Sequence, residues 1–364
     1  MRHSGQASQR LTKRALVTVS HAIERAALAT AEDGPLVVLA LFQRMPYFAR
    51  ERALYERISR RAAVTVVGVV GQSFGESPVG AYPVDLAETE DLAREWTVVA
   101  LTPRFGAALV AYDRAEVAPD ATTLEAGRLF DGDWSFRRDD ALHEVVRLRD
   151  QLADRLPPAA RTAIDHTLDR VRDVPPAPGE TRAQAAIQLL ADRVERARRV
   201  APPADETGPL LDVPGLRRWT GVDGVTASGT LPVALVAVRV QEPAGAPARL
   251  GRRGVARETQ AVIAALTGAL RPVDRAVRLA PHDYLLVLPA LDETGALAVA
   301  SEVRARVEAL ARSYPFVTFA VHAAVGVSDR RPLPVGEVRR ALDWAVRERV
   351  PVATVSPQVA TAVG

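Results

Sequence analysis

The segment from Arg271 to Pro289 limits the fold of this chain more than any other. Val277 and Leu279 alternate with polar neighbours, which is the period of a half-buried strand. Leu285–Leu288 form a short apolar run of the kind that lies fully buried in a sheet. The residues from Ala280 to Asp283 separate the two runs. The segment is therefore predicted to be a β-hairpin whose second strand lies in the core.

Strand-like and helix-like patterns surround this hairpin in the C-terminal part of the chain. The predicted elements are strands over 231–240, 316–327 and 351–355, and helices over 260–270, 296–310 and 335–349. This order predicts a central, mostly antiparallel sheet flanked by helices over residues 206–364.

The N-terminal part also alternates between helix and strand. Its predicted helices cover 8–30, 46–60, a short segment ending near Trp96, and 141–156, and its predicted strands cover 35–42, 64–70, 97–101 and 107–112. Gly68, Gly71 and Gly75 are expected to open a loop that forms a turn or one wall of a sensory pocket. The alternation predicts an α/β sandwich over residues 10–156, so the whole chain belongs to the α/β (α+β) class.

Residues 157–205 are predicted to be a helical linker. After a helix over 159–172, the apolar residues of a second helix recur at 3-4-3 spacing, namely Ile187, Leu190, Val194 and Ala197. This spacing suits the seam of a parallel dimer. The alternative is a helix that packs on its own domain, because the seam spans only about two heptads.

Composition excludes several classes of protein. The chain has no cysteine, so disulfides and thiolate metal sites are absent. No apolar run approaches the roughly 18 residues of a membrane helix, and residues 1–12 lack the apolar core of a signal peptide. At 364 residues with a formal net charge of only +3, a cytoplasmic, soluble, two-domain protein without a DNA or membrane partner is expected. No cofactor is expected, since the histidines His3, His21, His143, His166 and His322 lack metal-ligand spacing.

The hairpin resembles that of the GGDEF domain of diguanylate cyclases. In that family the turn reads Gly-Gly-Asp/Glu-Glu-Phe, and Arg-x-x-Asp lies five residues before it. Here the turn is Ala280-Pro281-His282-Asp283-Tyr284, whereas Arg271-x-x-Asp274 keeps the family spacing. The resemblance implies a nucleotide-cyclase palm that has lost its catalytic signature and retained its product-binding signature.

The resemblance also implies that the metal and triphosphate positions are gone. The family's metal-binding Asp-x-Asp corresponds to Arg239 and Gln241, and an arginine cannot bind Mg²⁺, which prefers oxygen ligands. Asp283 keeps a carboxylate without a partner across the site. Ala280 and Pro281 add bulk where glycines would let the backbone approach a triphosphate, and Pro281 removes an N–H donor.

The remaining catalytic positions point the same way. His282 is a lone histidine in a turn, which is more often neither a base nor a ligand. The family's guanine-reading motifs correspond to residues 208–216 and 251–256, where they are not retained, and its lysine in the last helix falls near Arg349. No catalytic residue and no enzyme activity are therefore predicted. Arg239 could contact a phosphate directly, but a solvated arginine or a local ion pair is the favoured interpretation.

Arg271 and Asp274 match the family's inhibitory site. There the arginine would donate to the guanine Hoogsteen edge and a phosphate, and the aspartate would accept from guanine N1–H and N2–H₂. Two other interpretations remain open. The two residues could form a surface salt bridge, or the short motif could match by chance in an arginine-rich chain.

The N-terminal third resembles the DICT sensory domain. The matching motifs are Leu11-Thr12-Lys13-Arg14, Ser20-x-x-Ile23-Glu24, Leu41-Phe42-Gln43, Tyr55-Glu56-Arg57 and Val64-Thr65-Val66-Val67. The resemblance implies a signal-sensing module without catalysis.

Three functions follow as hypotheses. The first is a non-catalytic signalling protein, a homodimer, that couples a sensory module to a degenerate GGDEF domain able to bind cyclic di-GMP at Arg271 and Asp274. The second is a protein-interaction scaffold that binds a protein partner and no nucleotide. The third is residual diguanylate cyclase activity.

Overall fold

The computed structural model describes residues 9–29, 33–43, 45–71, 79–119, 123–200, 210–220, 231–241, 246–312 and 319–355. His3, Gly75, Gly208, Pro209, residues 316–318 and the predicted boundary at 205/206 lie outside these ranges. The chain divides into two compact units, one of Met1–Arg114 with Leu129–Pro202 and the other of Ala115–Arg128 with Pro203–Gly364. Among the described helices, none combines the length and apolarity needed to cross a membrane.

Within the described residues, unit 1 is built on a seven-stranded mixed sheet of order β1-β7-β6-β5-β2-β3-β4. Its strands are β1 (Gln9–Thr12), β2 (Val37–Phe42), β3 (Val64–Val70), β4 (Tyr82–Leu86), β5 (Glu95–Leu101), β6 (Gly106–Val117) and β7 (Arg128–Ser135). Its helices are α1 (Lys13–Ala29), α2 (Met45–Ser59), α3 (Arg138–Gln151), α4 (Pro158–Arg172) and α5 (Glu180–Val200).

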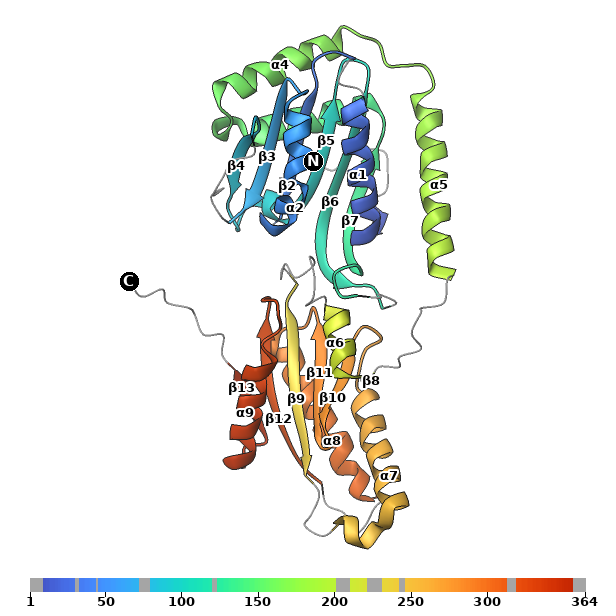
Figure 1. Cartoon of the computed structure of the whole chain (residues 1–364), viewed down its shortest axis with the longest axis vertical. Helices are drawn as coiled ribbons and strands as arrows, with labels where there is room; N and C mark the ends of the chain where they lie inside the picture. The colour runs from blue at the N-terminus through green and yellow to red at the C-terminus, as the bar shows by residue number, and fades with distance from the viewer. Residues whose placement is uncertain are drawn as a thin grey trace, which may run out of the picture. The chain divides into compact units, whose positions relative to one another are not determined.

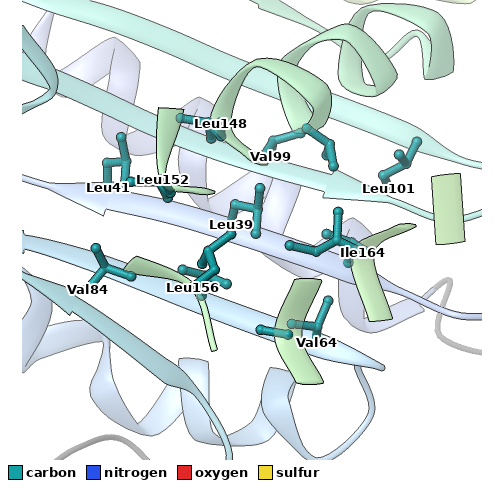
Figure 2. Packing of buried hydrophobic residues seen from close by; sticks show 14 of the residues in the cluster. Leu39, Leu41, Val64, Val84, Val99, Leu101, Leu148, Leu152, Leu156 and Ile164 are labelled. Atoms are coloured by element: carbon teal, nitrogen blue, oxygen red, sulfur yellow. The ribbon is translucent and has the colours of Figure 1, made fainter. Parts of the chain in front are cut away.

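Helices cover both faces of this sheet (Figure 1). Helices α1 and α2 pack on one face, and α3 and α4 pack on the other. Figure 2 shows the second interface, where Leu148, Leu152 and Ile164 lie over Leu39 and Val99. Every residue of β2 and β3 is buried, which explains why their sequences are continuous apolar runs.

Several details of unit 1 differ from the sequence-based expectation. Residues 9–12 form an edge strand that pairs with β7, so the first helix begins at Lys13. The short helix predicted before Trp96 is a single 3₁₀ turn over Asp91–Arg94. Gly68 lies inside β3, where a Cβ would come within 2.6 Å of the Leu41 side chain, so it serves packing and opens no loop. Strands β4 and β7 were not predicted.

The predicted linker is partly a component of unit 1. Ala160, Ile164, Leu168 and Val171 of α4 are buried in the core on the α3 side of the sheet. This helix therefore covers the sheet rather than connecting two domains.

Unit 2 contains, among its described residues, a six-stranded sheet of order β13-β12-β9-β11-β10-β8. Its strands are β8 (Leu210–Leu211), β9 (Val233–Gln241), β10 (Arg275–Ala280), β11 (Asp283–Pro289), β12 (Ala320–Ser328) and β13 (Val352–Val355). Its helices are α6 (Val213–Thr220), α7 (Ala246–Thr267), α8 (Glu293–Ala309) and α9 (Val335–Arg347). The four central strands pair antiparallel, and the two outer strands pair parallel, so the predicted mixed α/β class and mostly antiparallel sheet are confirmed.

Candidate functional site

Arg239, named above as a lost metal position, forms an ion pair between two adjacent strands of unit 2. Arg239 on β9 lies directly opposite Asp283 on β11. Its Nε and Nη2 donate to the two Asp283 carboxylate oxygens at 2.6 and 2.7 Å. Nη2 also lies 2.9 Å from Oδ1 of Asp343 on α9. These contacts are the local ion pair favoured from sequence, and Asp283 has a partner after all, in the arginine.

Electrostatics reinforces this arrangement. The hydrogen bond to Asp283 raises the pKa of Arg239 above its already high ordinary value, so the guanidinium remains charged. The Asp283 side chain is only 11% exposed, and a bidentate guanidinium satisfies both of its oxygens. The carboxylates of Asp283 and Asp343 therefore both face the Arg239 guanidinium at this position.

The hairpin turn is tight. Ala280 pairs with Asp283, which leaves Pro281 and His282 as the two turn residues. Their backbone carbonyls accept hydrogen bonds, that of Pro281 from Arg278 Nη2 at 3.0 Å and that of His282 from Val240 N at 3.0 Å. Tyr284, expected in the turn, belongs to β11 and is 2% exposed, so it is a core residue.

Arg271 and Asp274 contact each other directly. The Asp274 carboxylate accepts from the Arg271 backbone N at 2.7 Å and from its Nη2 at 2.8 Å. Arg271 Nη2 also donates to the carbonyl of Pro289 at 2.8 Å. The side chain of Arg271 is 43% exposed, whereas that of Asp274 is 1% exposed. The arginine is thus accessible to a ligand, and the aspartate is enclosed in the turn that orients it.

Unit 1 contains a cavity of about 130 Å³ between α1, α2 and the sheet. Its walls combine aromatic rings with charged and polar groups, contributed by Lys13, Val17, Ser20, His21, Phe42, Gln43, Tyr47, Arg50, Glu51 and Trp96. The Lys13 ammonium lies 4.1 Å from the centre of the Tyr47 ring. Of the residues that the structure describes, neither Gly68 nor Gly71 lines this cavity, so the predicted glycine wall is not part of it.

A buried carboxylate lies next to the cavity. Glu24 is 1% exposed, and its Oε1 accepts from Ser20 Oγ at 3.2 Å and from the Tyr55 hydroxyl at 3.0 Å. Burial raises the pKa of Glu24 to about 7, although the Tyr55 hydrogen bond opposes the shift. Burial, together with Glu24, also raises the pKa of Tyr55 well above its usual value.

One cluster of potential ligands was not predicted from the histidine spacing. His21, Glu24 and Glu51 each offer one potential ligand atom, and these three atoms lie within 4.8 Å of one another. His21 Nε2 is 3.4 Å from Glu51 Oε1. His21 and Glu24 are three residues apart on α1, which places them on one helix face and was a signal available in the sequence. Glu51 comes from α2, so its position depended on how the helices pack.

Comparisons with known proteins agree with both resemblances. Residues 1–114 match the DICT family model, described as a sensory domain in diguanylate cyclases and two-component systems. No curated protein matches the chain.

Solved structures of GGDEF domains match the C-terminal part of the chain. The GGDEF domain of DgcB from Caulobacter crescentus, solved with c-di-GMP, is 14% identical and covers 43% of this chain and 98% of its own, with a TM-score of 0.35. Diguanylate cyclase SiaD from Pseudomonas aeruginosa, solved with its activator SiaC, is 18% identical and covers 60% and 87%, with a TM-score of 0.36. A microbial GGDEF domain solved with cyclic di-GMP is 18% identical and covers 40% and 94%, with a TM-score of 0.31. The chain thus combines residues 1–114, which match the DICT family model, with a C-terminal part that is similar to solved GGDEF domains.

Proposed function

We propose that this chain is a non-catalytic signalling protein in which the DICT domain receives an input and the GGDEF-like unit acts as a receptor or output module. The observation that carries the proposal is Arg239, which pairs with Asp283 and Asp343. Phosphoryl transfer requires bound metal ions that neutralise charge and position the phosphates. A guanidinium held between these carboxylates supplies charge but offers no coordination sites.

The test is incubation of the full chain with GTP and Mg²⁺, with chromatographic detection of products and an active diguanylate cyclase as positive control. We expect no cyclic di-GMP. Its formation would contradict the non-catalytic assignment and favour the residual cyclase.

For the receptor role, we propose that cyclic di-GMP binds at Arg271. The guanidinium is partly exposed, and its Nη1, which the hydrogen bonds to Asp274 and Pro289 do not use, can donate to a guanine acceptor or a phosphate. In this arrangement Asp274 orients the arginine through two of its donors. A guanine contact with Asp274 itself would require the turn to open.

Calorimetry with cyclic di-GMP on the wild type, Arg271→Ala and Arg304→Ala tests the site. Arg304 is a matched control because it is a similarly exposed arginine, which lies on α8 and pairs with Glu308. Binding is expected in the wild type and in Arg304→Ala, with a loss of at least about tenfold in Arg271→Ala, the equivalent of about 1.4 kcal/mol. Absence of heat in all three proteins removes the receptor role.

A second candidate is a protein-interaction scaffold, which the enclosure of Asp274 favours. A side chain that is 1% exposed is already satisfied within its own turn, as a structural salt bridge would be. If a protein partner binds equally with and without cyclic di-GMP, and equally to Arg271→Ala, the scaffold is the better description.

A further inference from the structure

The cluster formed by His21, Glu24 and Glu51 in unit 1 has the composition of a metal site. Two ligands come from successive turns of α1 and the third from α2, so the packing of the two helices brings them together. His21 and Glu51 also line the cavity described above. This site is independent of the palm and of the function proposed for unit 2.

The spacing of the donor atoms fits a single small ion. Zinc binds nitrogen and oxygen ligands at about 2.0–2.2 Å, so neighbouring donors in a tetrahedral site lie roughly 3.4 Å apart. His21 Nε2 and Glu51 Oε1 are separated by 3.4 Å, and all three donor atoms fall within 4.8 Å of one another. The three donor atoms would need to move only slightly toward one another to coordinate the ion.

The hydrogen bonding of Glu24 points independently to a ligand. Its Oε1 accepts from Ser20 and Tyr55, which hold the carboxylate in place as outer-shell partners do in metal sites. Its Oε2 is buried and has no hydrogen-bond partner among the described residues. A buried carboxylate oxygen without a partner is costly, and a bound cation would remove that cost.

We propose that His21, Glu24 and Glu51 bind a divalent transition-metal ion of the zinc class. Imidazole together with carboxylates selects such ions, whereas Mg²⁺ and Ca²⁺ favour sites made of oxygen ligands alone. Three protein ligands leave the fourth position of a tetrahedral ion to water or a small molecule. Because two of the ligands line the cavity, that position is accessible from it, which gives the sensory domain a metal-dependent input.

The experiment uses the full chain, freed of metal with a chelator and titrated calorimetrically with ZnCl₂ and separately with MgCl₂. One Zn²⁺ per chain is expected, bound at least about 100-fold more tightly than Mg²⁺. His21→Ala and Glu51→Gln should each weaken binding by at least about tenfold. His143→Ala is the matched control, because His143 is an exposed histidine of the same unit on α3, and it should bind like the wild type.

A second measurement separates loss of the site from loss of the fold. Co²⁺ in the wild type should give the visible absorption of a four-coordinate ion, and His21→Ala should lose this spectrum while its circular dichroism stays unchanged. The proposal is overturned if the wild type binds Zn²⁺ no better than His21→Ala, or if His143→Ala weakens binding equally.

Discussion

At the scale of single residues, the ion pairs of Arg239 are expected to contribute to the stability of unit 2. Arg239 lies on β9 directly opposite Asp283 on β11, and its hydrogen bonds satisfy the Asp283 carboxylate, which is 11% exposed. Asp343 contributes to the same guanidinium from α9 but is 59% exposed. The first contact is therefore expected to matter for stability, and the second is screened by solvent.

Arg239→Ala should lower the stability of unit 2 by about 1–3 kcal/mol, because it leaves the Asp283 carboxylate without its donors. Asp343→Asn, the control, should change stability by less than about 1 kcal/mol. Urea titration with hydrogen exchange measured on β9 and β11 compares the two. Equal effects would mean that Asp283 does not depend on the arginine.

At the scale of elements, α3 is anchored to the sheet through a buried charge network. Arg147 donates to Glu144 on its own helix and to Glu95 at the start of β5, and both carboxylates are 1% exposed. Tyr112 on β6 donates to Glu95 at 2.9 Å. This network joins α3, β5 and β6 of unit 1. Its buried carboxylates would be costly without a charged partner.

Arg147→Ala should destabilise unit 1 by about 3–5 kcal/mol, because it leaves two buried carboxylates unpaired. Arg149→Ala provides a control on the same helix, since its partner Asp165 is 43% exposed and the pair should contribute less than about 1 kcal/mol. Thermal unfolding followed by circular dichroism measures the difference. A small effect of Arg147→Ala would show that water replaces the arginine.

Helix α5 leaves three residues of the predicted dimer seam open to solvent. Its N-terminal part packs against the end of β7 in the same unit, where the Gln184 side chain accepts from Phe136 N at 2.7 Å and donates to the Trp134 carbonyl at 3.2 Å. Further along, the seam residues Ile187, Leu190 and Val194 are 38, 60 and 47% exposed. An apolar seam left open on one chain can be covered by the same seam of a second copy.

We predict a dimer by light scattering and its conversion to monomer in Leu190→Glu, because a charge at the seam centre would be buried in the pair. Leu189→Glu is the matched control, since Leu189 is 48% exposed but lies off the seam. A monomeric wild type at high concentration would count against the prediction, as would equal effects of the two variants.

At the scale of the whole molecule, the chain carries two units with separate hydrophobic cores. A protein with two cores need not unfold in one step. A ligand stabilises the unit that binds it by an amount set by its concentration relative to the dissociation constant.

In scanning calorimetry, cyclic di-GMP at 100 times its dissociation constant should therefore stabilise the transition of unit 2 by about 2.7 kcal/mol. Hydrogen exchange assigns each transition to its unit. The shift should vanish in Arg271→Ala and persist in Arg304→Ala. A shift that survives Arg271→Ala would place the nucleotide elsewhere.

Local patterns were enough to predict most elements. The apolar runs that became β2 and β3, the hairpin of β10 and β11, and the helical repeat of α5 were all visible, because each depends on the period of neighbouring residues. Strands β1, β4 and β7 were missed. Strand β1 has only four residues and pairs with β7, far along the chain, whereas β4 and β7 pair with the strands that precede them, β3 and β6.

For the candidate sites, too, some features were visible in the sequence and others only in the tertiary structure. From the sequence alone came Arg239 and Gln241 at the end of a predicted strand, Ala280 and Pro281 in a predicted turn, and the spacing of Arg271 and Asp274. Only the tertiary structure decided that Arg239 meets Asp283, that Asp274 is enclosed, and that His21, Glu24 and Glu51 converge. Residue types and their periods are properties of the chain read along its length. Which side chains meet depends on strand register and helix packing, and these are settled only when distant segments share one core.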